Sequence, residues 1–392
     1  MIGPLKGVRI LDLTHFVAGP WCTMLLADLG AEVIKLEPPG GEIGRGMGSV
    51  YTAGESAIFL GFNRGKRSIS LDLKQPEGLA AALRLADQAD IVVQNFRPGT
   101  AERLGIGAEA LRAKNPRLIY CTVSAFGPDG PYASRPANDP IIQALTGAMS
   151  ATGQAGGLPV RMGVSLPDAA AGILAATGIL AAIYNRADTG QGSTIELNLL
   201  DTQLYAQTDL ITAATSAEAM NPATTVPKQS AEEPAPIRGA YICADGLSLW
   251  VDSDHTFFDE ERMPGGFDVD REQVAALLRT QPRKHWMNVL GPIGTRITPV
   301  LGLSDVLPDG SVRTLEVDHP TIGRLRQVRT PITVVPAWPP VDSPPPRLGE
   351  HTRDVLQELG FADTEIDRMT ALGIIHTATS MPCTQTTPPS AN

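Results

Sequence analysis

The protein has 392 residues and a formal net charge of −10, with 43% hydrophobic and 19% charged residues. This length exceeds one ordinary domain and predicts two, while the acidic balance argues against a general surface for nucleic acid or anionic membranes. The four cysteines lie far apart without a CxxC pair, which argues against a disulfide framework or a zinc site.

Strands and helices are predicted to alternate along the first part of the chain. Short runs of strand-forming residues predict strands at 8–14, 32–37, 68–73, 90–96 and 117–126. Helical spacing predicts the intervening helices at 20–31, 76–89 and 107–113. This alternation predicts an α/β fold with a parallel sheet that helices cover on both faces.

The remainder of the chain is predicted to complete this domain and to form a smaller one. The predicted segments are a small-residue helical region at 140–215, a linker at 214–236, a smaller α+β region at 237–330, a proline-rich extended segment at 331–348, helices at 349–375 and a disordered tail at 376–392. The smaller region is expected to begin with two strands around a turn at Asp245 and Gly246.

The sequence carries no recognisable targeting or membrane segment. Its start, MIGPLKGVRILDL, lacks the charged beginning and apolar core of a signal peptide. The longest apolar-leaning run, 169–184, is interrupted by Gly172 and Gly178 and is shorter than the roughly 20 residues that a membrane span needs. We therefore expect a cytoplasmic protein without a membrane or nucleic-acid partner.

The loops after the first two predicted strands are candidate ligand loops. The first, HFVAGP, holds one glycine where dinucleotide-binding proteins carry GxGxxG, so NAD is not expected. The glycine-rich stretch at 38–48 is either a surface loop or a loop shaped around a ligand. His15 either lines a site or is an ordinary packed or exposed histidine.

Basic residues at or just beyond predicted strand ends are candidate phosphate contacts, because open α/β sheets bind ligands at the carboxyl ends of their strands. These residues are Lys66, Arg67, Lys74, Arg97 and Arg103. Arg97 directly follows a strand and suits a phosphate, although exposed surface charge is the alternative for each of them. The histidines have no metal-binding spacing such as HxH or HExxH, so no metal is expected.

Asp168 stands at the start of a long segment rich in alanine and glycine. Ser165, Pro167 and Asp168 fit a helix start, with the serine as N-cap and the aspartate as a capping-box acid. A carboxylate at a helix start among small residues is also placed to attack an electrophile. The two interpretations are compatible.

Eight stretches match, in order, the sequence pattern of one family. They are PLKGVRILDLT with the following AGP, LLADLGAEVIKLEPPGG, FNRGKRSISLDLK, DIVVQNFRPGTAERLGIG, NPRLIYCTVSAFGPDGPY, PIIQALTGAMSATG, GVSLPDAAAGILAATGILAAIYNRADTGQGSTIELNLLD and LGEHTRDVLQELGF. On these stretches the chain resembles the family III CoA transferases (CaiB/BaiF family), a group that includes formyl-CoA and carnitine CoA transferases and α-methylacyl-CoA racemase.

The resemblance implies a fold and a set of partners. It implies a large Rossmann-like domain from residues 1–213 with 331–375, a smaller α+β domain at 237–330, and a homodimer of two interlocked chains. Coenzyme A, carried as acyl-CoA, and a carboxylic acid would be the substrates.

The resemblance also implies a nucleophile and a CoA site. Asp168 would attack the thioester, giving a mixed anhydride and then an aspartyl-CoA thioester. The positions that the family uses to contact CoA correspond to Val17, Ala18, Leu71, Asp72, Leu73, Lys74, Asn95, Phe96, Arg97, Arg103, Ala137, Asn138 and Asp139.

Several positions depart from the family pattern and leave alternatives open. Pro38 replaces a frequent arginine, Val17 replaces the glutamine of formyl-CoA transferases, and the smaller domain is shortened, with MPGGF at 263–267 as a remnant of the glycine-rich lid. Racemase-like proton transfer is one alternative, yet Asn138 stands where the racemase has a catalytic histidine, and asparagine cannot act as an acid or base. A non-catalytic CoA-binding relative is the other alternative.

Overall fold

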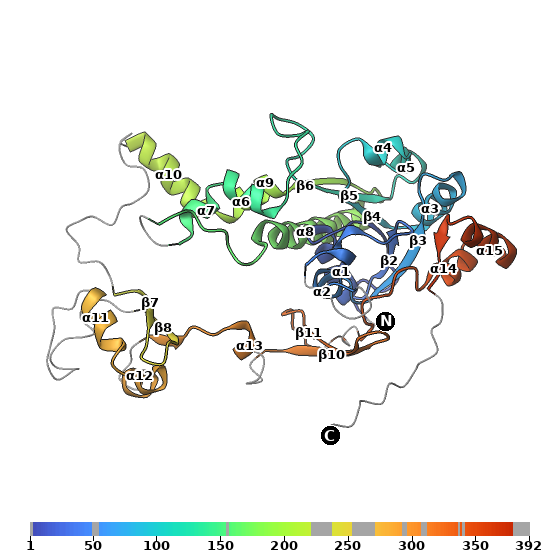
Figure 1. The fold of residues 1–392 in the computed structure, drawn as a ribbon. Coiled ribbons are helices and arrows are strands. Elements are labelled where there is room, and N and C mark those ends of the chain that lie inside the picture. The colour runs from blue at the N-terminus through green and yellow to red at the C-terminus, as the bar shows by residue number, and fades with distance from the viewer. Residues whose placement is uncertain are drawn as a thin grey trace, which may run out of the picture. The chain divides into compact units, whose positions relative to one another are not determined.

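The computed structural model describes residues 3–48, 55–153, 157–220, 237–252, 271–291, 296–306, 312–335, 338 and 342–378. The chain divides into two compact units, Met1–Thr208 with Thr314–Asn392 as the larger and Asp209–Arg313 as the smaller. Each unit is visible in Figure 1 by its labelled elements.

The larger unit is built on a seven-stranded sheet with the order β12-β3-β2-β1-β4-β5-β6. The strands are β1 (Arg9–Leu13), β2 (Glu32–Glu37), β3 (Lys66–Leu71), β4 (Ile91–Gln94), β5 (Ile119–Ser124), β6 (Thr194–Asn198) and β12 (Ile375–His376). Strands β1 to β6 pair in parallel, and β12 pairs antiparallel with β3 at one edge. The order 3-2-1-4-5-6 is that of Rossmann-type sheets, so the predicted parallel α/β sheet is confirmed.

Helices cover both faces of this sheet (Figure 1). One face packs against α1 (Ala18–Asp28) and α8 (Leu166–Thr189), and the other against α3 (Pro76–Gln88), α5 (Ala108–Lys114), α14 (Thr352–Glu358) and α15 (Asp363–Ala371). Neighbouring strand residues point to opposite faces. Ile10 therefore joins the core beneath α1 and α8, while Leu11 joins the core beneath α3 and α14.

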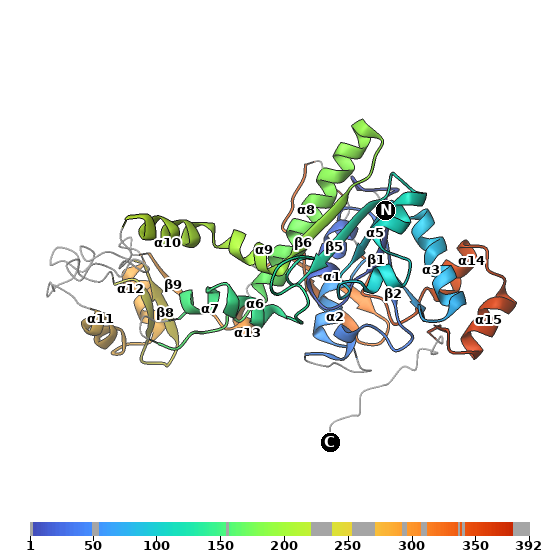
Figure 2. The ribbon, with the colours of Figure 1, turned by 90° about the horizontal axis from the view of Figure 1, so that it is seen from above.

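Helix α8 runs along β5 and β6 and packs closely on α1 (Figure 2). A Cβ added at Gly172 would lie 2.8 Å from the Ala18 carbonyl oxygen, so the two backbones touch where the side chain is missing. By length and hydropathy α8 alone among the described helices could cross a membrane. The sequence-based argument from its length was therefore wrong, but the burial of Ala171, Ala175 and Ile179 makes α8 a core helix. The cytoplasmic location stays a prediction.

One strand was predicted as helix. Residues 140–215 were expected to be helical throughout, yet Thr194–Asn198 forms β6 and extends the sheet beside β5. The remaining elements of this region are α6 (Asp139–Leu145), α7 (Ala148–Ala151), α9 (Leu199–Ala206) and α10 (Thr208–Met220). Short helices elsewhere in the larger unit are η1 (Ile43–Gly46), α2 (Ala57–Phe62) and α4 (Thr100–Arg103).

The smaller unit contains a three-stranded antiparallel sheet and short helices. Its elements are β7 (Gly239–Ile242), β8 (Ser248–Val251), β9 (Ile297–Pro299), α11 (Arg271–Leu278), α12 (Arg283–Leu290) and α13 (Leu303–Val306). Strands β7 and β8 pair around the predicted turn, where Gly246 has a φ of 75°.

Several predicted segment ends differ from the observed ones. Residues 214–220 continue α10, whereas they were expected to begin the linker. The hairpin β10 (Thr314–His319) and β11 (Gly323–Val328) belongs to the larger unit, and Gln327 Nε2 donates to the Leu60 carbonyl. His376 lies in β12 and not in a tail. The rest of the expected linker, the MPGGF stretch and residues 379–392 lie outside the described residues.

Candidate active site

A cavity of about 380 Å³ lies at the carboxyl ends of β1 and β4. The strand order reverses between these two strands, which is where open α/β sheets bind ligands. The cavity brings together most of the site residues that the sequence predicted. These are Val17, Ala18, Asn95, Phe96, Arg97, Ala137, Asn138, Asp139 and Asp168, and His15 lines it as well.

Two groups of expected CoA contacts do not line this cavity. Leu71 is buried in β3 opposite Ile375, and the backbone of Asp72 donates to the Ile374 carbonyl at 2.8 Å. Leu73 packs against the core on the α3 side of the sheet. Lys74 and Arg103 are exposed elsewhere, and Arg103 Nη2 donates to Thr100 Oγ1.

The candidate phosphate contacts at the start of β3 form internal ion pairs. Lys66 Nζ is fully buried, 3.0 Å from Asp12 Oδ2, and Arg67 pairs with Glu32 and Glu358. Both residues begin β3, so they lie at the amino edge of the sheet and not at the carboxyl edge. The hypothesis that they contact a ligand was therefore wrong.

Asp168 is the third residue of α8 and is only 5% exposed. Ser165 occupies the N-cap position, but its side chain makes no capping hydrogen bond. Asp168 Oδ2 accepts no hydrogen bond from any described residue. The capping-box interpretation is therefore wrong, and a buried carboxylate oxygen stands without a partner at the cavity wall.

Burial and, to a smaller extent, the nearby Asp139 charge raise the pKa of Asp168 to about 7, against the opposing effect of the Arg161 charge. Asp139 begins α6 and is itself buried, which raises its pKa too. Gln143 Nε2 donates to Asp139 Oδ1 at 2.7 Å, and Asp139 Oδ2 has no described partner. Asn138 Oδ1 accepts from the Ile141 N–H at 3.4 Å and so caps α6. The site therefore holds two carboxylates, and each has a buried oxygen without a hydrogen-bond partner among the described residues.

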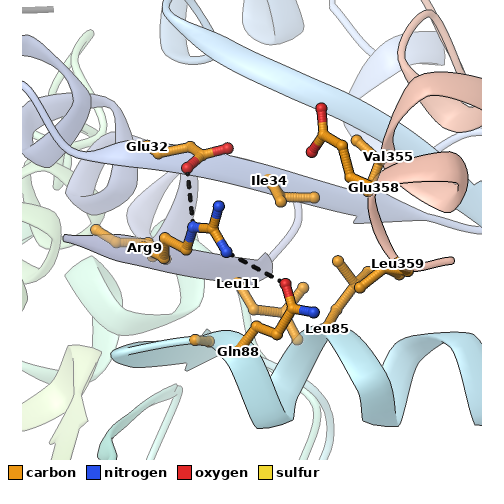
Figure 3. A pocket seen from close by; sticks show the side chains of 11 residues that line it. Arg9, Leu11, Glu32, Ile34, Leu85, Gln88, Val355, Glu358 and Leu359 are labelled. Carbon is orange, nitrogen blue, oxygen red and sulfur yellow. Dashed lines mark hydrogen bonds and ion pairs between the residues drawn. The ribbon is translucent and has the colours of Figure 1, made fainter. Parts of the chain in front are cut away.

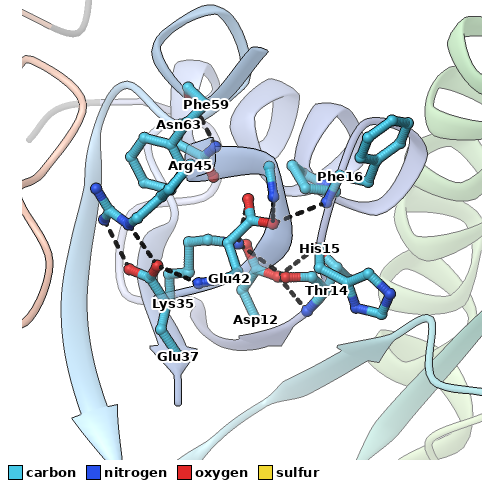
Figure 4. A network of polar contacts seen from close by, with 12 residues as sticks. Asp12, Thr14, His15, Phe16, Lys35, Glu37, Glu42, Arg45, Phe59 and Asn63 are labelled. Carbon is cyan, nitrogen blue, oxygen red and sulfur yellow. Dashed lines mark hydrogen bonds and ion pairs between the residues drawn. The ribbon is translucent and has the colours of Figure 1, made fainter. Parts of the chain in front are cut away.

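The loop after β1 is held by Asn95 on one side and by Glu42 on the other, and Figure 4 shows the Glu42 side. Asn95, which follows β4, accepts from the His15 N–H at 2.9 Å and donates to the His15 carbonyl at 2.8 Å. Phe16 has a φ of 73°, the left-handed region that a non-glycine residue rarely adopts, and its N–H donates to Glu42 Oε2 at 3.1 Å. Asn95 therefore joins the two loops at the point where the strand order reverses.

Glu42 lies beside a network of buried charged residues that includes Lys35, Glu37 and Arg45 (Figure 4). Lys35 Nζ lies 3.9 Å from Glu42 Oε1 and donates to the Thr14 carbonyl at 2.8 Å. Arg45 bonds Glu37 through two nitrogens and lies 3.5 Å above the Phe59 ring. The glycine-rich stretch at 38–48 was the sequence signal for this region, but its partners could not be read from spacing.

The first turn of α1 offers backbone donors to the cavity. Val17 occupies the N-cap position and provides no side-chain cap, and Ala18 and Gly19 have no acceptor within the helix because they lie in its first turn. Pro20 has no N–H to satisfy. The α1 N-terminus can therefore hold an anion or an oxyanion in the cavity that Asp168 also lines.

The hollow at the other edge of the sheet is too small to hold a substrate (Figure 3). It encloses about 20 Å³, room for about one water molecule, and is lined by Arg9, Glu32 and Gln88. Arg9 Nη1 donates to Gln88 Oε1 and its Nε to Glu32 Oε2. Across the described residues, no group of three His, Cys, Asp or Glu side chains could hold a metal.

The chain is similar to characterised CoA-transferases. It matches the model of CoA-transferase family III over residues 5–352. It is 33% identical to a succinyl-CoA:glutarate CoA-transferase of Mus musculus, over 95% of this chain and 90% of the mouse protein. It is 35% identical to an acetyl-CoA:oxalate CoA-transferase of Acetobacter aceti, over 80% of this chain and 85% of that protein.

A solved structure shows the same fold. The crystal structure of a CAIB/BAIF family protein from Brucella suis aligns with a TM-score of 0.81 at 30% identity, over 92% of this chain and 100% of that one. The family resemblance read from the eight sequence stretches is thereby confirmed. The chain belongs to CoA-transferase family III.

Proposed function

We propose that this protein transfers CoA from an acyl-CoA thioester to a carboxylic acid, with Asp168 as the nucleophile. The observation that carries the proposal is the buried, unpartnered Asp168 Oδ2 in the wall of the cavity. A carboxylate that water does not solvate attacks a carbonyl carbon more readily than a hydrated one. The Asp168 pKa of about 7 still leaves the ionised, attacking form accessible at neutral pH.

The transfer proceeds through two covalent states of Asp168. Its carboxylate attacks the thioester carbonyl carbon, the C–S bond breaks, and CoA leaves as the thiolate beside a mixed anhydride. The thiolate attacks the Asp168 carbonyl carbon of this anhydride and releases the donor acid, which leaves an aspartyl-CoA thioester. The acceptor carboxylate then repeats the two exchanges in reverse and frees Asp168.

Each tetrahedral oxyanion of this path requires nearby donors. The N–H groups of Ala18 and Gly19 are the proposed donors, because they lack helix acceptors in the first turn of α1 and Ala18 lines the cavity. In this proposal, bound CoA runs along the carboxyl ends of β3 and β4. Lys74 and Arg103, both exposed there, and Arg97 at the cavity mouth supply positive charge for its phosphates.

Dicarboxylic acids are the proposed class of acceptor. The relatives from Mus musculus and Acetobacter aceti are named for glutarate and oxalate, which each carry two carboxylates. These names support a diacid substrate here, with CoA thioester as the shared donor.

A homodimer is the proposed assembly. Several large apolar side chains of α1, α2, α8 and β11 line an open hollow of about 700 Å³ on the larger unit, among them Trp21, Phe62, Ile173 and Val328. An apolar hollow of this size on one surface suits a partner chain. Light scattering of the purified protein measures the assembly, and a monomer at micromolar concentration would contradict this proposal.

One observation favours a second candidate function, racemase-like proton transfer. His15 lines the same cavity as Asp168, and burial lowers its pKa, so a neutral imidazole base is available there. Deuterium uptake at the α-carbon of a branched acyl-CoA, without any acceptor acid, would support this candidate.

The test of the proposed function is trapping at Asp168. Mixtures of acyl-CoA donors and carboxylic acids are screened by mass spectrometry for new thioesters, and hydroxylamine is then added during turnover. We expect a protein-bound hydroxamate at Asp168, with Asp188→Ala, an exposed acid of the same helix, as the active control. Full transfer by Asp168→Ala would refute the mechanism, and CoA binding without any turnover would indicate a non-catalytic relative.

A further inference from the structure

Arg161 is a cation that the structure ties to Asp139, which lines the cavity together with Asp168. It precedes α8 in a segment whose backbone is tied to α6 and α7. The Met162 N–H donates to Gln143 Oε1 at 3.0 Å, and the Val160 N–H donates to the Met149 carbonyl at 3.0 Å. Gln143 is fully buried and bonds Asp139 with its other end. One amide side chain therefore positions both the segment that carries Arg161 and the acid beside Asp168.

The guanidinium of Arg161 retains donors for a ligand. Its Nη2 lies 3.3 Å from Asp139 Oδ1, and this is the one hydrogen bond that the described residues give to its five N–H groups. The Arg161 side chain is 46% exposed, whereas that of Asp139 is 3% exposed. Asp139 therefore holds Nη2 of Arg161, while the other N–H groups of this guanidinium make no hydrogen bond to the described residues.

Arg161 also differs from the two arginines that line the cavity, Arg97 and Arg135. Its charge lowers the pKa of Asp168, and its ion pair with Asp139 holds it next to the second carboxylate of the cavity. Arg135, in the cavity wall, lies over the Tyr132 ring at 5.1 Å. Arg97 follows β4 and borders both this cavity and a second hollow, which Glu102 and Asp129 also line.

An acid with two carboxylates needs a permanent cation near the reacting centre. The carboxylate that reacts loses its charge when it becomes acylated or thioesterified, but the second carboxylate stays ionised throughout the exchange. Asp139 and Asp168 give the site two potential negative charges, which oppose a dianion unless a cation compensates. Arginine binds a carboxylate through two parallel N–H bonds with fixed geometry.

We propose that Arg161 binds the second, non-reacting carboxylate of a dicarboxylic acid or of its CoA thioester, and thereby selects diacids over monoacids. The inference rests on the proposed transferase function and adds the residue that recognises this class of substrate. Arg161 keeps its Asp139 contact through Nη2 and offers its other N–H donors to the ligand. Gln143 is a positioning residue for this arrangement.

The test compares acids of equal length that differ only in the second charge. Wild type and Arg161→Gln are assayed with succinyl-CoA as donor and with glutarate, its monoamide or valerate as acceptor. We expect Arg161→Gln to lower kcat/KM for glutarate at least about tenfold more than for the two monoacids, because a hydrogen bond to a charged group is lost. The ratio between acids cancels any common effect on Asp168.

Two further variants keep the result interpretable. Arg161→Lys retains the charge but not the paired geometry, so its preference for glutarate over the monoacids should fall between those of wild type and Arg161→Gln. Arg135→Gln should change kcat/KM for all three acids by a similar factor. Equal losses with all three acids in Arg161→Gln would overturn the inference and leave the transferase function intact. A wild-type protein that transfers CoA to none of the acids screened would instead overturn the proposed function, and the inference with it.

Discussion

The N–H of Phe16 donates to Glu42 Oε2 across 3.1 Å while Phe16 holds a φ of 73°. The same oxygen accepts from the Gly44 N–H, so one carboxylate links the loop after β1 to the loop after β2. A non-glycine residue with positive φ costs energy that its surroundings must offset. Glu42 therefore positions the backbone that leads into the first turn of α1.

Removing the Glu42 carboxylate should lower kcat/KM by more than the loss of folding stability alone would explain. Glu42→Ala leaves two N–H groups without their acceptor and releases Phe16, so we expect kcat/KM to fall about tenfold or more and stability to fall by about 2 kcal/mol. Glu42→Gln keeps an acceptor oxygen and should lose less. The control is Glu55→Ala, because Glu55 is a buried partner of Arg45 and makes no hydrogen bond to the loop after β1 among the described residues. Equal losses of kcat/KM in Glu42→Ala and Glu55→Ala would contradict this role.

The pH dependence of the reaction should report Asp168. Because the ionised carboxylate attacks and its pKa is about 7, kcat/KM for the acyl-CoA should rise with pH and level off above about pH 7. The Asp139 charge raises this pKa, so Asp139→Asn should move the rise to lower pH. Steady-state rates between pH 5 and pH 9 measure both positions. A rise that stays in place or moves upward in Asp139→Asn would show that the two carboxylates do not interact.

Asp168 should destabilise the fold when it ionises. Its folded-state pKa lies above the ordinary aspartate value of 3.8, so the folded protein holds this proton more tightly, and the resulting stability is lost progressively as the pH rises from about 3.8 to about 7. Asp168→Asn should therefore stabilise the protein more at pH 8 than at pH 5, by at most about 3 kcal/mol. Urea unfolding at the two pH values gives this difference. Asp188→Asn, on the exposed end of α8, is the control, and an equal gain from both variants would exclude the effect.

The buried arginine behind the site should be far more important for stability than surface arginines. Arg45→Met leaves Glu37 and Glu55 buried without their cation, and we expect a loss of about 3–5 kcal/mol. Arg45→Lys should recover little, since lysine cannot reproduce the paired bonds to Glu37. Arg353→Met, which breaks exposed pairs, should cost less than about 1 kcal/mol. Similar unfolding midpoints for Arg45→Met and Arg353→Met would contradict the comparison.

The parallel sheet could be predicted because its strands and helices have different hydrophobic periods. Strands β1 to β5 and helices α1, α3 and α5 lie where the periods predicted them. β6 was missed because its residues, TIELN, adjoin helical sequence on both sides, and its partner β5 lies about 70 positions earlier in the chain. Strand pairing over such a separation leaves no local signal.

The residues of the site were easier to find than their roles. Asn95 was predicted to contact CoA, which stays a prediction, and the structure adds that its side chain bonds both backbone groups of His15, 80 positions away. Asp168 was read locally as a cap, although no capping bond forms. Glu42, Gln143 and Arg161 were not predicted at all, because each acts through a polar contact between separate segments. Sequence spacing describes neighbours along one element, and these contacts cross between elements.

Gly172 lies one turn after Asp168 on α8, where a Cβ would come within 2.8 Å of the Ala18 carbonyl oxygen and 3.0 Å of the Trp21 Cβ. The distance between the Asp168 carboxylate and the α1 amides therefore depends on Gly172 having a hydrogen atom where alanine would have a methyl group. A single added carbon there would push the two helices apart and misalign the groups that meet the substrate, while leaving every one of those groups chemically intact. Control of the reaction geometry thus extends to a residue that substrate never touches.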